Sequence, residues 1–586
     1  MNPSKCLFVC LAFLPNCLVI GCLFLGCLVS AASAQSLLTV ALSGTAAPGT
    51  GADFSSFDIP NLNSAGRAAF RGVVTGPGVN SGNEQGIWSE GGGSLGLVAR
   101  TGSGAPGTSA DFSFLNSPVL NGAGQTAFLG TLLFGPGAGA NDNTGIWSEG
   151  GGSLALVARE GSSAPGTSAD FSFLTSPGFN SAGQTAFFAG LTGTGVTSSN
   201  NTGIWSEGNG SLALVAREGS TAPGTSADFS FLESPILNGA GQTAFLGTLT
   251  GTGVNANNDR GIWSEGSGAL DLAVRTGSAA PGTSADFSFL SSPDFNGAGQ
   301  VAFWGEITGT GVTSNNNRGI WSEGSGAVAL VARTGDLAPG TSADFSLLIN
   351  PVLNGVGQTA FTGFLTGTGV SSDNDRGIWS EGSGSLTLIA RKGDGAPGTS
   401  ADFSFLSSPI FNGAGQTAFW GNLTGTGVDN SNNFGIWAQD TSGVLTLIAR
   451  SGDQLDVDDG PGTDLRTISE LGIVAFNGSE DGRASVFNNL GQMVFRASFT
   501  DGSSGIFVSN LVASNLSGDF DGDGDVDGSD FLEWQRTDGS ASGLLQWQTN
   551  YGAASSSALA TAVPEPSTLM LGALAGLAMW RRKSGR

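Results

Sequence analysis

The sequence predicts an all-β protein, and within that class a closed β-propeller of about eight four-stranded blades. Three observations favour this fold. A unit of about 58 residues recurs along most of the chain, each unit has room for four short strands, and 97 of the 586 residues are glycine. Glycine supplies the positive φ angles that tight turns between short strands need. A fixed period of this size is typical of solenoids and propellers.

Two short motifs mark the repeat. Ala-Pro-Gly-Thr and Gly-Ile-Trp each recur every 58 residues, with one step of 59. An eighth, divergent unit ends in Gly505-Ile506-Phe507. The prolines of the first motif are Pro48, Pro106, Pro165, Pro223, Pro281, Pro339 and Pro397. The tryptophans of the second are Trp88, Trp147, Trp205, Trp263, Trp321, Trp379 and Trp437.

Each unit contains four candidate strands. In the sixth unit they cover residues 377–381, 385–391, 401–406 and 416–423, with alternating apolar side chains. The Gly-rich turn at residues 412–415 suits a hairpin between the last two. Four short antiparallel strands match the size of one propeller blade.

The two ends of the array predict ring closure. Residues 37–44 resemble the second strand of a unit but follow no Gly-Ile-Trp strand, whereas the eighth unit ends in Gly-Ile-Phe with no strand after it. Pairing these two strands would close the ring and remove exposed sheet edges. The alternative is an open β-solenoid, which would need capping units.

The best-kept stretch of each unit is the octet at residues 121–128, Asn-Gly-Ala-Gly-Gln-Thr-Ala-Phe. Close copies end at Phe70, Phe187, Phe245, Phe303, Phe361 and Phe419. This octet resembles the NxxGxxAF tandem-repeat family of bacterial surface proteins. The resemblance covers residues 35–513 and implies export and surface display, and the family brings no catalytic residues.

The N-terminus predicts export through the secretion machinery. Lys5 precedes an apolar run to about Val29, and Ala32-Ser33-Ala34 forms a small-residue cleavage site, so residues 1–34 are interpreted as a signal peptide. A signal anchor is one alternative. A lipoprotein box at residues 19–22, which would acylate Cys22, is another.

The C-terminus predicts sorting to the cell surface. An apolar segment at residues 569–580 is too short for a comfortable permanent span of about 20 residues. It lies between a Pro-Glu-Pro motif and a basic cluster, namely Val563, Pro564, Glu565, Pro566 and Arg581, Arg582, Lys583. Residues 563–586 closely resemble the PEP-CTERM signal, which implies an exosortase-type sorting enzyme as partner. Membrane contact is then expected only through this segment and before processing, in the envelope or extracellular matrix of a bacterium.

A calcium-binding loop is predicted before the tail. Carboxylates at loop positions 1, 3, 5, 9 and 12, with Gly524 at position 6 and a carbonyl at position 7, have the spacing of oxygen ligands for Ca²⁺. The ligands are Asp519, Asp521, Asp523, Asp525, Asp527 and Asp530. The loop resembles a dockerin repeat, but its second half at 544–548 lacks an acidic loop, so residues 517–552 form half a dockerin-like module and cohesin docking is doubtful. The alternative is a disordered acidic linker; residues 553–562 are a linker in either case.

Composition excludes several classes of function. The chain has no histidine, and all five cysteines lie within residues 6–27, so a mature chain has no His base, thiolate nucleophile or His/Cys zinc site. A net charge of −25 disfavours nucleic-acid binding. Carboxylate-pair glycosidase chemistry needs an asymmetric site, which near-identical units disfavour. The unit-specific acids Glu233, Asp294, Glu306 and Asp394 are scattered. We therefore expect no enzymatic activity.

The repeated Trp, Asp and Arg, such as Trp321, Asp344 and Arg333, have two interpretations. The tryptophans could stack sugars from a bound polysaccharide. The favoured interpretation is that tryptophan packs between blades while Asp and Arg satisfy turns or pair. The glutamates of Trp-Ser-Glu, namely Glu149, Glu207, Glu265 and Glu323, are expected to be solvated edge charges. The sequence thus predicts a structural or adhesive surface protein; the alternatives are a lectin-like propeller and a subunit of polysaccharide degradation.

Overall fold

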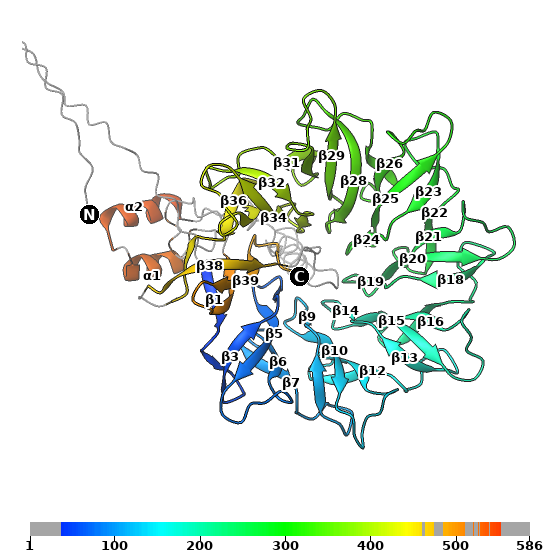
Figure 1. Cartoon of the computed structure of the whole chain (residues 1–586), viewed down its shortest axis with the longest axis horizontal. Helices are drawn as coiled ribbons and strands as arrows, with labels where there is room; N and C mark the ends of the chain where they lie inside the picture. The colour runs from blue at the N-terminus through cyan, green and yellow to red at the C-terminus, as the bar shows by residue number, and fades with distance from the viewer. Residues whose placement is uncertain are drawn as a thin grey trace, which may run out of the picture. The chain divides into compact units, whose positions relative to one another are not determined.

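The computed structural model describes residues 37–459, 463–473, 485–509, 518, 520, 526, 528–537 and 539–551. All of these lie in the compact unit Gln35–Arg586. Its strands form eight antiparallel sheets, which are arranged as blades around a central axis (Figure 1). The prediction of an eight-bladed propeller is therefore confirmed, and the open solenoid is wrong.

One blade shows the pattern of the others. Its sheet has the order β18 (Asp228–Leu232), β20 (Thr243–Thr250), β21 (Arg260–Ser264) and β22 (Asp271–Arg275). A two-residue strand, β19 (Ile236–Leu237), pairs with β20 beside this path and lies near the axis (Figure 1). Most blades therefore have five strands rather than the predicted four, because the short inner segment before the conserved octet adds a strand of its own.

The remaining blades follow in chain order. The first has β2 (Ala46–Ala47), β3 (Ala52–Phe57), β4 (Asn61–Leu62), β5 (Ala68–Thr75), β6 (Gln85–Ser89) and β7 (Gly96–Arg100). The second has β8 (Phe112–Leu115), β9 (Val119–Leu120), β10 (Thr126–Leu132), β11 (Thr144–Ser148) and β12 (Ala155–Arg159). The third has β13 (Asp170–Leu174), β14 (Gly178–Phe179), β15 (Thr185–Thr192), β16 (Thr202–Ser206) and β17 (Ala213–Arg217). The fourth is the blade described above.

The fifth has β23 (Asp286–Leu290), β24 (Asp294–Phe295), β25 (Val301–Thr308), β26 (Arg318–Ser322) and β27 (Ala329–Arg333). The sixth has β28 (Asp344–Leu353), β29 (Thr359–Thr366), β30 (Arg376–Ser380) and β31 (Thr387–Arg391). The seventh has β32 (Asp402–Leu406), β33 (Ile410–Phe411), β34 (Thr417–Thr424), β35 (Phe434–Gln439) and β36 (Leu445–Arg450). The four strands predicted for the sixth unit therefore divide between two neighbouring sheets.

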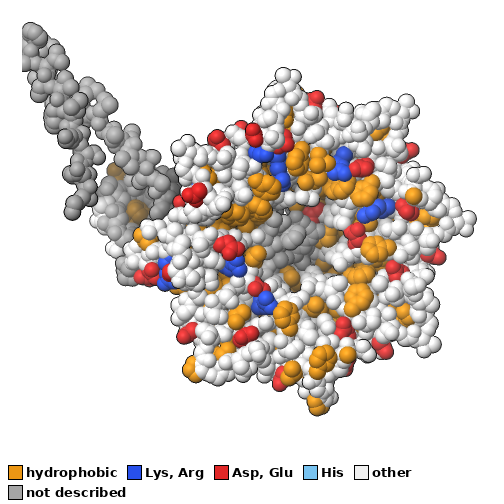
Figure 2. All heavy atoms as spheres, viewed as in Figure 1, with side chains coloured by type: hydrophobic (Ala, Val, Ile, Leu, Met, Phe, Trp, Pro, Cys, Tyr) orange, Lys and Arg blue, Asp and Glu red, His pale blue; other side chains and the backbone are white. Residues whose placement is uncertain are grey.

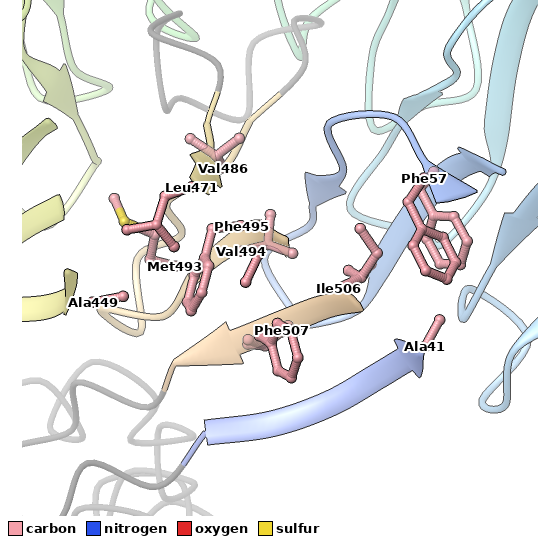
Figure 3. Packing of buried hydrophobic residues seen from close by; sticks show 14 of the residues in the cluster. Ala41, Phe57, Ala449, Leu471, Val486, Met493, Val494, Phe495, Ile506 and Phe507 are labelled. Atoms are coloured by element: carbon pink, nitrogen blue, oxygen red, sulfur yellow. The ribbon is translucent and has the colours of Figure 1, made fainter. Parts of the chain in front are cut away.

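The eighth blade is shared by the two ends of the array. Its order is β1 (Leu37–Leu42), β40 (Ser504–Ser509), β39 (Met493–Phe499), β38 (Leu465–Gly472) and β37 (Gln454–Asp456). Strand β1 runs antiparallel to β40, from Leu37 opposite Ser509 to Leu42 opposite Gly505. Figure 3 shows the two strands side by side, with Ala41, Ile506 and Phe507 among the packed side chains. The predicted ring closure is confirmed.

The apolar cores lie between blades. In one of them, Ile87 and Ala99 of the first blade pack with Phe112, Phe128 and Trp147 of the second. The next core repeats the arrangement one blade further on. Because the Gly-Ile-Trp strand turns its two large side chains to opposite faces, each blade contributes to the core before it and to the core after it.

A ring of asparagines surrounds the axis. The first residue of each conserved octet, or its equivalent, donates from Nδ2 to the main-chain carbonyl of the matching asparagine in the next blade, at 2.7–3.4 Å. All eight are at most 4% exposed. The order is Asn63, Asn121, Asn180, Asn238, Asn296, Asn354, Asn412 and Asn488, from which the ring returns to Asn63. Each Oδ1 also accepts main-chain N–H groups of its own turn, as Asn238 does from Ala240 and Gln242.

Among the described residues two helices follow the array, α1 (Gly528–Thr537) and α2 (Ala541–Asn550). They pack through Phe531 and Trp547, whose ring centroids are 4.8 Å apart. Trp534 donates Nε1–H to the carbonyl of Ser540 at 3.0 Å, and the Ser540 hydroxyl caps α2 by accepting from the Gly543 N–H. The chain therefore forms a small helical hairpin here, at the two segments whose sequences echo each other.

Candidate functional site

The seven repeated tryptophans are structural. Each is 0% exposed, and each Nε1–H donates to the carbonyl of the proline in Ala-Pro-Gly-Thr at 2.9–3.0 Å. In the fourth blade Phe229 meets the Trp263 ring edge-on at 4.7 Å, and Phe245 stacks on it at 6.3 Å. The Nε1–H hydrogen bond therefore fixes the Gly-Ile-Trp strand of each unit against the Ala-Pro-Gly-Thr turn of the same unit. A ring with no exposed face cannot stack on a sugar in this conformation, so burial favours the packing interpretation.

The glutamates of Trp-Ser-Glu are not solvated edge charges, and the expectation for Glu149, Glu207, Glu265 and Glu323 is corrected. Each is half-buried, and its carboxylate accepts a hydrogen bond from the main-chain N–H of the sixth octet residue in its own blade. Glu265 Oε2, for example, accepts from the main-chain N–H of Thr243 at 2.8 Å and from its hydroxyl at 2.6 Å. The partner lies 22 residues earlier in the chain, so the sequence alone gave no sign of this clamp.

The clamp of Glu323 lacks the hydroxyl donor, and so does that of Glu90, the equivalent glutamate of the first blade. Glu90 faces Ala68 and Glu323 faces Val301, so each carboxylate accepts only from a main-chain N–H, at 2.9 Å. Burial raises the pKa of both carboxyls, although the N–H donors oppose the shift. A missing hydroxyl therefore leaves a half-buried negative charge poorly compensated.

The repeated arginines satisfy turns, as expected. Arg333 donates Nε–H to the carbonyl of Asn316 at 2.7 Å, and the matching arginines of other blades do the same. Asp344 is exposed at the start of β28. The repeated tryptophans, glutamates and arginines are therefore occupied by structural contacts, and a functional site has to be sought where the units differ.

Arginines and aromatic rings come together at positions that differ between units, except for Phe289 and Phe405, whose position is phenylalanine in most units. Arg260 lies over Phe289 of the next blade at 4.5 Å, Phe289 stacks on Trp304 at 4.9 Å, and Arg318 lies over Trp304 at 4.0 Å. Further on, Arg376 lies over Phe364 and over Phe405 of the next blade. Figure 2 shows hydrophobic side chains gathered around the centre of one face, with acidic and basic ones between them. Sequence reasoning missed this set; comparing the units column by column would have found its positions.

A pocket of about 540 Å³ involves three blades. Its wall includes Phe188 of the third blade, Phe231 and Glu233 of the fourth, and Ser292 of the fifth. Phe231 is 49% exposed. Glu233 is already engaged, because it pairs with Arg260 at 3.5 Å and accepts from the Ser292 hydroxyl. The pocket is therefore lined by a mixture of apolar side chains and serines, and its one carboxylate is paired.

The other unit-specific acids do not form a carboxylate pair with one another in any contact that the structure shows among its described residues. Glu306 pairs with Arg318 at 2.6 Å. Asp294 is buried and accepts from the main-chain N–H of Leu353 at 2.7 Å. Burial raises the pKa of Asp394, and nearby Arg391 opposes the shift.

Most of the predicted calcium loop lies outside the described residues, namely Asp519, Asp521, Asp523, Asp525 and Asp527. Asp530 is described: it is 0% exposed in the first turn of α1, and its Oδ1 accepts from the main-chain N–H of Phe520 at 2.6 Å. Among the described residues no group of three or more acidic side chains is arranged to hold a metal. This hydrogen bond joins positions 2 and 12 of the predicted loop.

The predicted signal peptide and the sorting signal lie outside the described residues. In the part of the chain that is described, no helix is long and apolar enough to cross a membrane. Residues 562–583 match the model of the PEP-CTERM protein-sorting motif. The prediction of an exported protein sorted to the cell surface is confirmed at that level.

Two overlapping matches to the model of a family of unknown function, DUF7453, span residues 25–207 and 176–514. The chain belongs to this family. The DUF7453 matches include every strand from β1 to β40. No curated protein matches the chain.

Solved structures similar to this DUF7453 chain are distant propellers. The β-propeller domain of the Trilobed protease from Pyrococcus furiosus is 10% identical, with a TM-score of 0.36, over 68% of this chain and 100% of that one. An oligogalacturonate lyase from Vibrio parahaemolyticus is 10% identical, with a TM-score of 0.33, over 82% of this chain and 99% of that one. The Dos1 propeller is 10% identical, with a TM-score of 0.33, over 81% and 95%. At these values no activity is inferred from them.

Proposed function

We propose that this protein is a non-catalytic structural and adhesive propeller of the bacterial envelope surface or extracellular matrix. One observation carries the proposal: the tryptophans, glutamates and asparagines that recur in most or all units are occupied in holding the ring together. The tryptophans donate to prolines, the glutamates clamp the octets, and the asparagines link neighbouring blades. The sorting motif supports the location.

The absence of enzymatic activity is part of this proposal. Glycosidase chemistry needs two carboxyls in different environments, one of them able to hold a proton. The unit-specific Glu233 and Glu306 each face an arginine, and Asp294 accepts a main-chain N–H. These contacts favour structural roles for the acids that make the units unequal.

The calcium-stapled module is proposed as a second part of the same protein. The acidic loop would hold Ca²⁺ through its aspartates, and Asp530 is already buried against the start of the loop. The ion would draw α1 and α2 into a fixed hairpin. The dockerin resemblance remains a proposal about this module.

The test uses cells that produce the full chain and matched cells that lack it. We expect the protein in envelope or matrix fractions, and we expect the cells that lack it to lose cohesion in the matrix. A chain in which Pro564, Glu565 and Pro566 are changed to alanine should not restore cohesion. Unchanged cohesion without the protein would contradict the adhesive role. Release of reducing sugars from matrix polysaccharide by the purified chain would contradict the non-catalytic assignment.

A further inference from the structure

Arg376 is a cation that contacts no counter-charge among the residues that the structure describes, and its buried Nε has no hydrogen-bond partner there. Its guanidinium lies between two phenyl rings, 5.2 Å from the centroid of Phe364 and 4.4 Å from that of Phe405. It makes no ion pair and no side-chain hydrogen bond with any residue that the structure describes. Burial lowers its pKa, which Asp375 opposes, but Asp375 itself contacts Lys392 at 3.8 Å. Half-buried arginines are normally paired.

The equivalent arginines of the two preceding blades are neutralised. Arg318 pairs with Glu306, which stands opposite it in the neighbouring strand. Arg260 pairs with Glu233, which follows the first strand of its own blade. In the sixth blade Phe364 stands opposite Arg376, and Ile349 replaces the Glu233 position. Both carboxylates have therefore been replaced by apolar side chains while the arginine is kept.

Aromatic rings extend the stack on one side. Phe405 stacks on Trp420 at 5.1 Å, and Trp420 stacks on Phe434 at 5.2 Å. We call Phe364, Arg376, Phe405, Trp420 and Phe434 the arginine–aromatic cluster. Ring faces within the stack are covered by their neighbours, so a ligand can only approach its edges. Aromatic edges carry partial positive charge, and the guanidinium presents its N–H donors in its own plane. The edge of the cluster therefore favours an anion.

We propose that the arginine–aromatic cluster binds the carboxylate of a uronic acid residue in an extracellular polysaccharide. A planar carboxylate can accept two parallel hydrogen bonds from one guanidinium. The hydroxyl oxygens of the sugar ring attached to it would face the partly positive edges of the flanking rings. One arginine in a chain of net charge −25 suits a polymer in which acidic and neutral sugars alternate, because a dense polyanion would be repelled.

This inference rests on the proposed surface function and identifies the class of ligand. A ligand-observed NMR titration of the full chain tests it with three probes: a hyaluronan tetrasaccharide, neutral chitotetraose, and tetraglycine with a free C-terminus. Only the hyaluronan fragment should bind saturably, and more weakly as salt rises. No saturable binding of the hyaluronan fragment, equal binding of chitotetraose, or tighter binding of tetraglycine would each overturn the uronate assignment.

Variants tie the binding to the cluster. Arg376→Gln should weaken binding about tenfold, the loss of a charge-assisted hydrogen bond. Phe364→Glu recreates the Arg–Glu pair of the fifth blade and keeps Arg376. It should weaken binding by about the same factor as Arg376→Gln. This second variant tests the site even if Arg376→Gln does not fold. Arg318→Gln, the matched control, should stay within about twofold, since that arginine is already paired. Unchanged affinity in Arg376→Gln or Phe364→Glu would contradict the site. Cell fractionation, which does not depend on Arg376, tests the surface location separately.

Discussion

The side-chain amide of Asn488 donates to the main-chain carbonyl of Asn63 across 3.1 Å, although the two residues are 425 positions apart. This is the hydrogen bond that completes the asparagine ring. It joins the last octet to the first, across the boundary between the first blade and the eighth blade in which β1 pairs with β40. Polar groups that are 4% exposed need such partners, because an unpaired buried donor costs about 1–3 kcal/mol. The octet is thus repeated because each copy serves two blades.

Asn238→Asp should destabilise the propeller by about 1–3 kcal/mol at neutral pH. The new carboxylate could still accept from its own turn but would lose the donor to Asn296 and face that carbonyl with a negative charge. Acidification should restore part of the loss, because a protonated carboxyl can donate. Denaturant unfolding at several pH values measures this.

The matched control is Asn258→Asp in an exposed loop, where Nδ2 donates only to Gly253 of the same loop. Its cost should be clearly smaller. Equal costs at the two positions would show that the ring is not what stabilises neighbouring blades.

Val301→Thr should stabilise the protein at neutral pH by about 1 kcal/mol. It supplies Glu323 with the hydroxyl donor that Thr243 gives Glu265. In the native chain the raised pKa of Glu323 means that its contribution is most favourable below the ordinary value of 4.5 and is lost as pH rises through the raised value. The added hydroxyl favours the ionised form, so the gain should appear on going from acid to neutral pH.

Unfolding free energies of both proteins between pH 3.5 and 7 provide the measurement. The reverse change, Thr243→Val, should cost a similar amount at neutral pH. A gain for Val301→Thr that is as large at pH 3.5 as at pH 7 would mean that the effect is not a contact with the carboxylate.

Removal of calcium should destabilise residues 517–552 and leave the array folded. The ligands would repel one another without the ion, whereas none of the described residues of this segment belongs to a propeller core. Hydrogen exchange with and without chelator reports on the two regions separately. Asp530→Ala should mimic chelation in α1 and α2. If chelation leaves exchange in the helices unchanged, the metal assignment fails.

The sequence was sufficient to predict the features that follow from the order of the repeats along the chain. The blade number followed from the period, and closure followed from residues 37–44, a strand without its partner. The roles of single side chains depended instead on contacts that the period does not encode. Glu265 resembles a surface charge until the register of β20 and β21 places Thr243 beside it.

The arginine–aromatic cluster illustrates the same limit. Phe364 and Arg376 are 12 positions apart in the sequence and become neighbours only because their strands pair. Phe405 belongs to the next blade, so its contact with Arg376 depends on how blades pack. Repetition in the sequence drew attention to tryptophans that are buried, whereas the cluster, apart from Phe405, lies at positions that vary from unit to unit.

Hydrogen exchange in β1 tests most directly the claim that the ring is closed by the chain's own ends. Because β1 pairs with β40, we predict that peptides covering residues 37–42 and 504–509 are protected as strongly as β20 and β21 in the middle of the array, and that they lose protection together. Complete exchange of residues 37–42 at the earliest labelling time, with the middle blades still protected, would contradict the closed propeller.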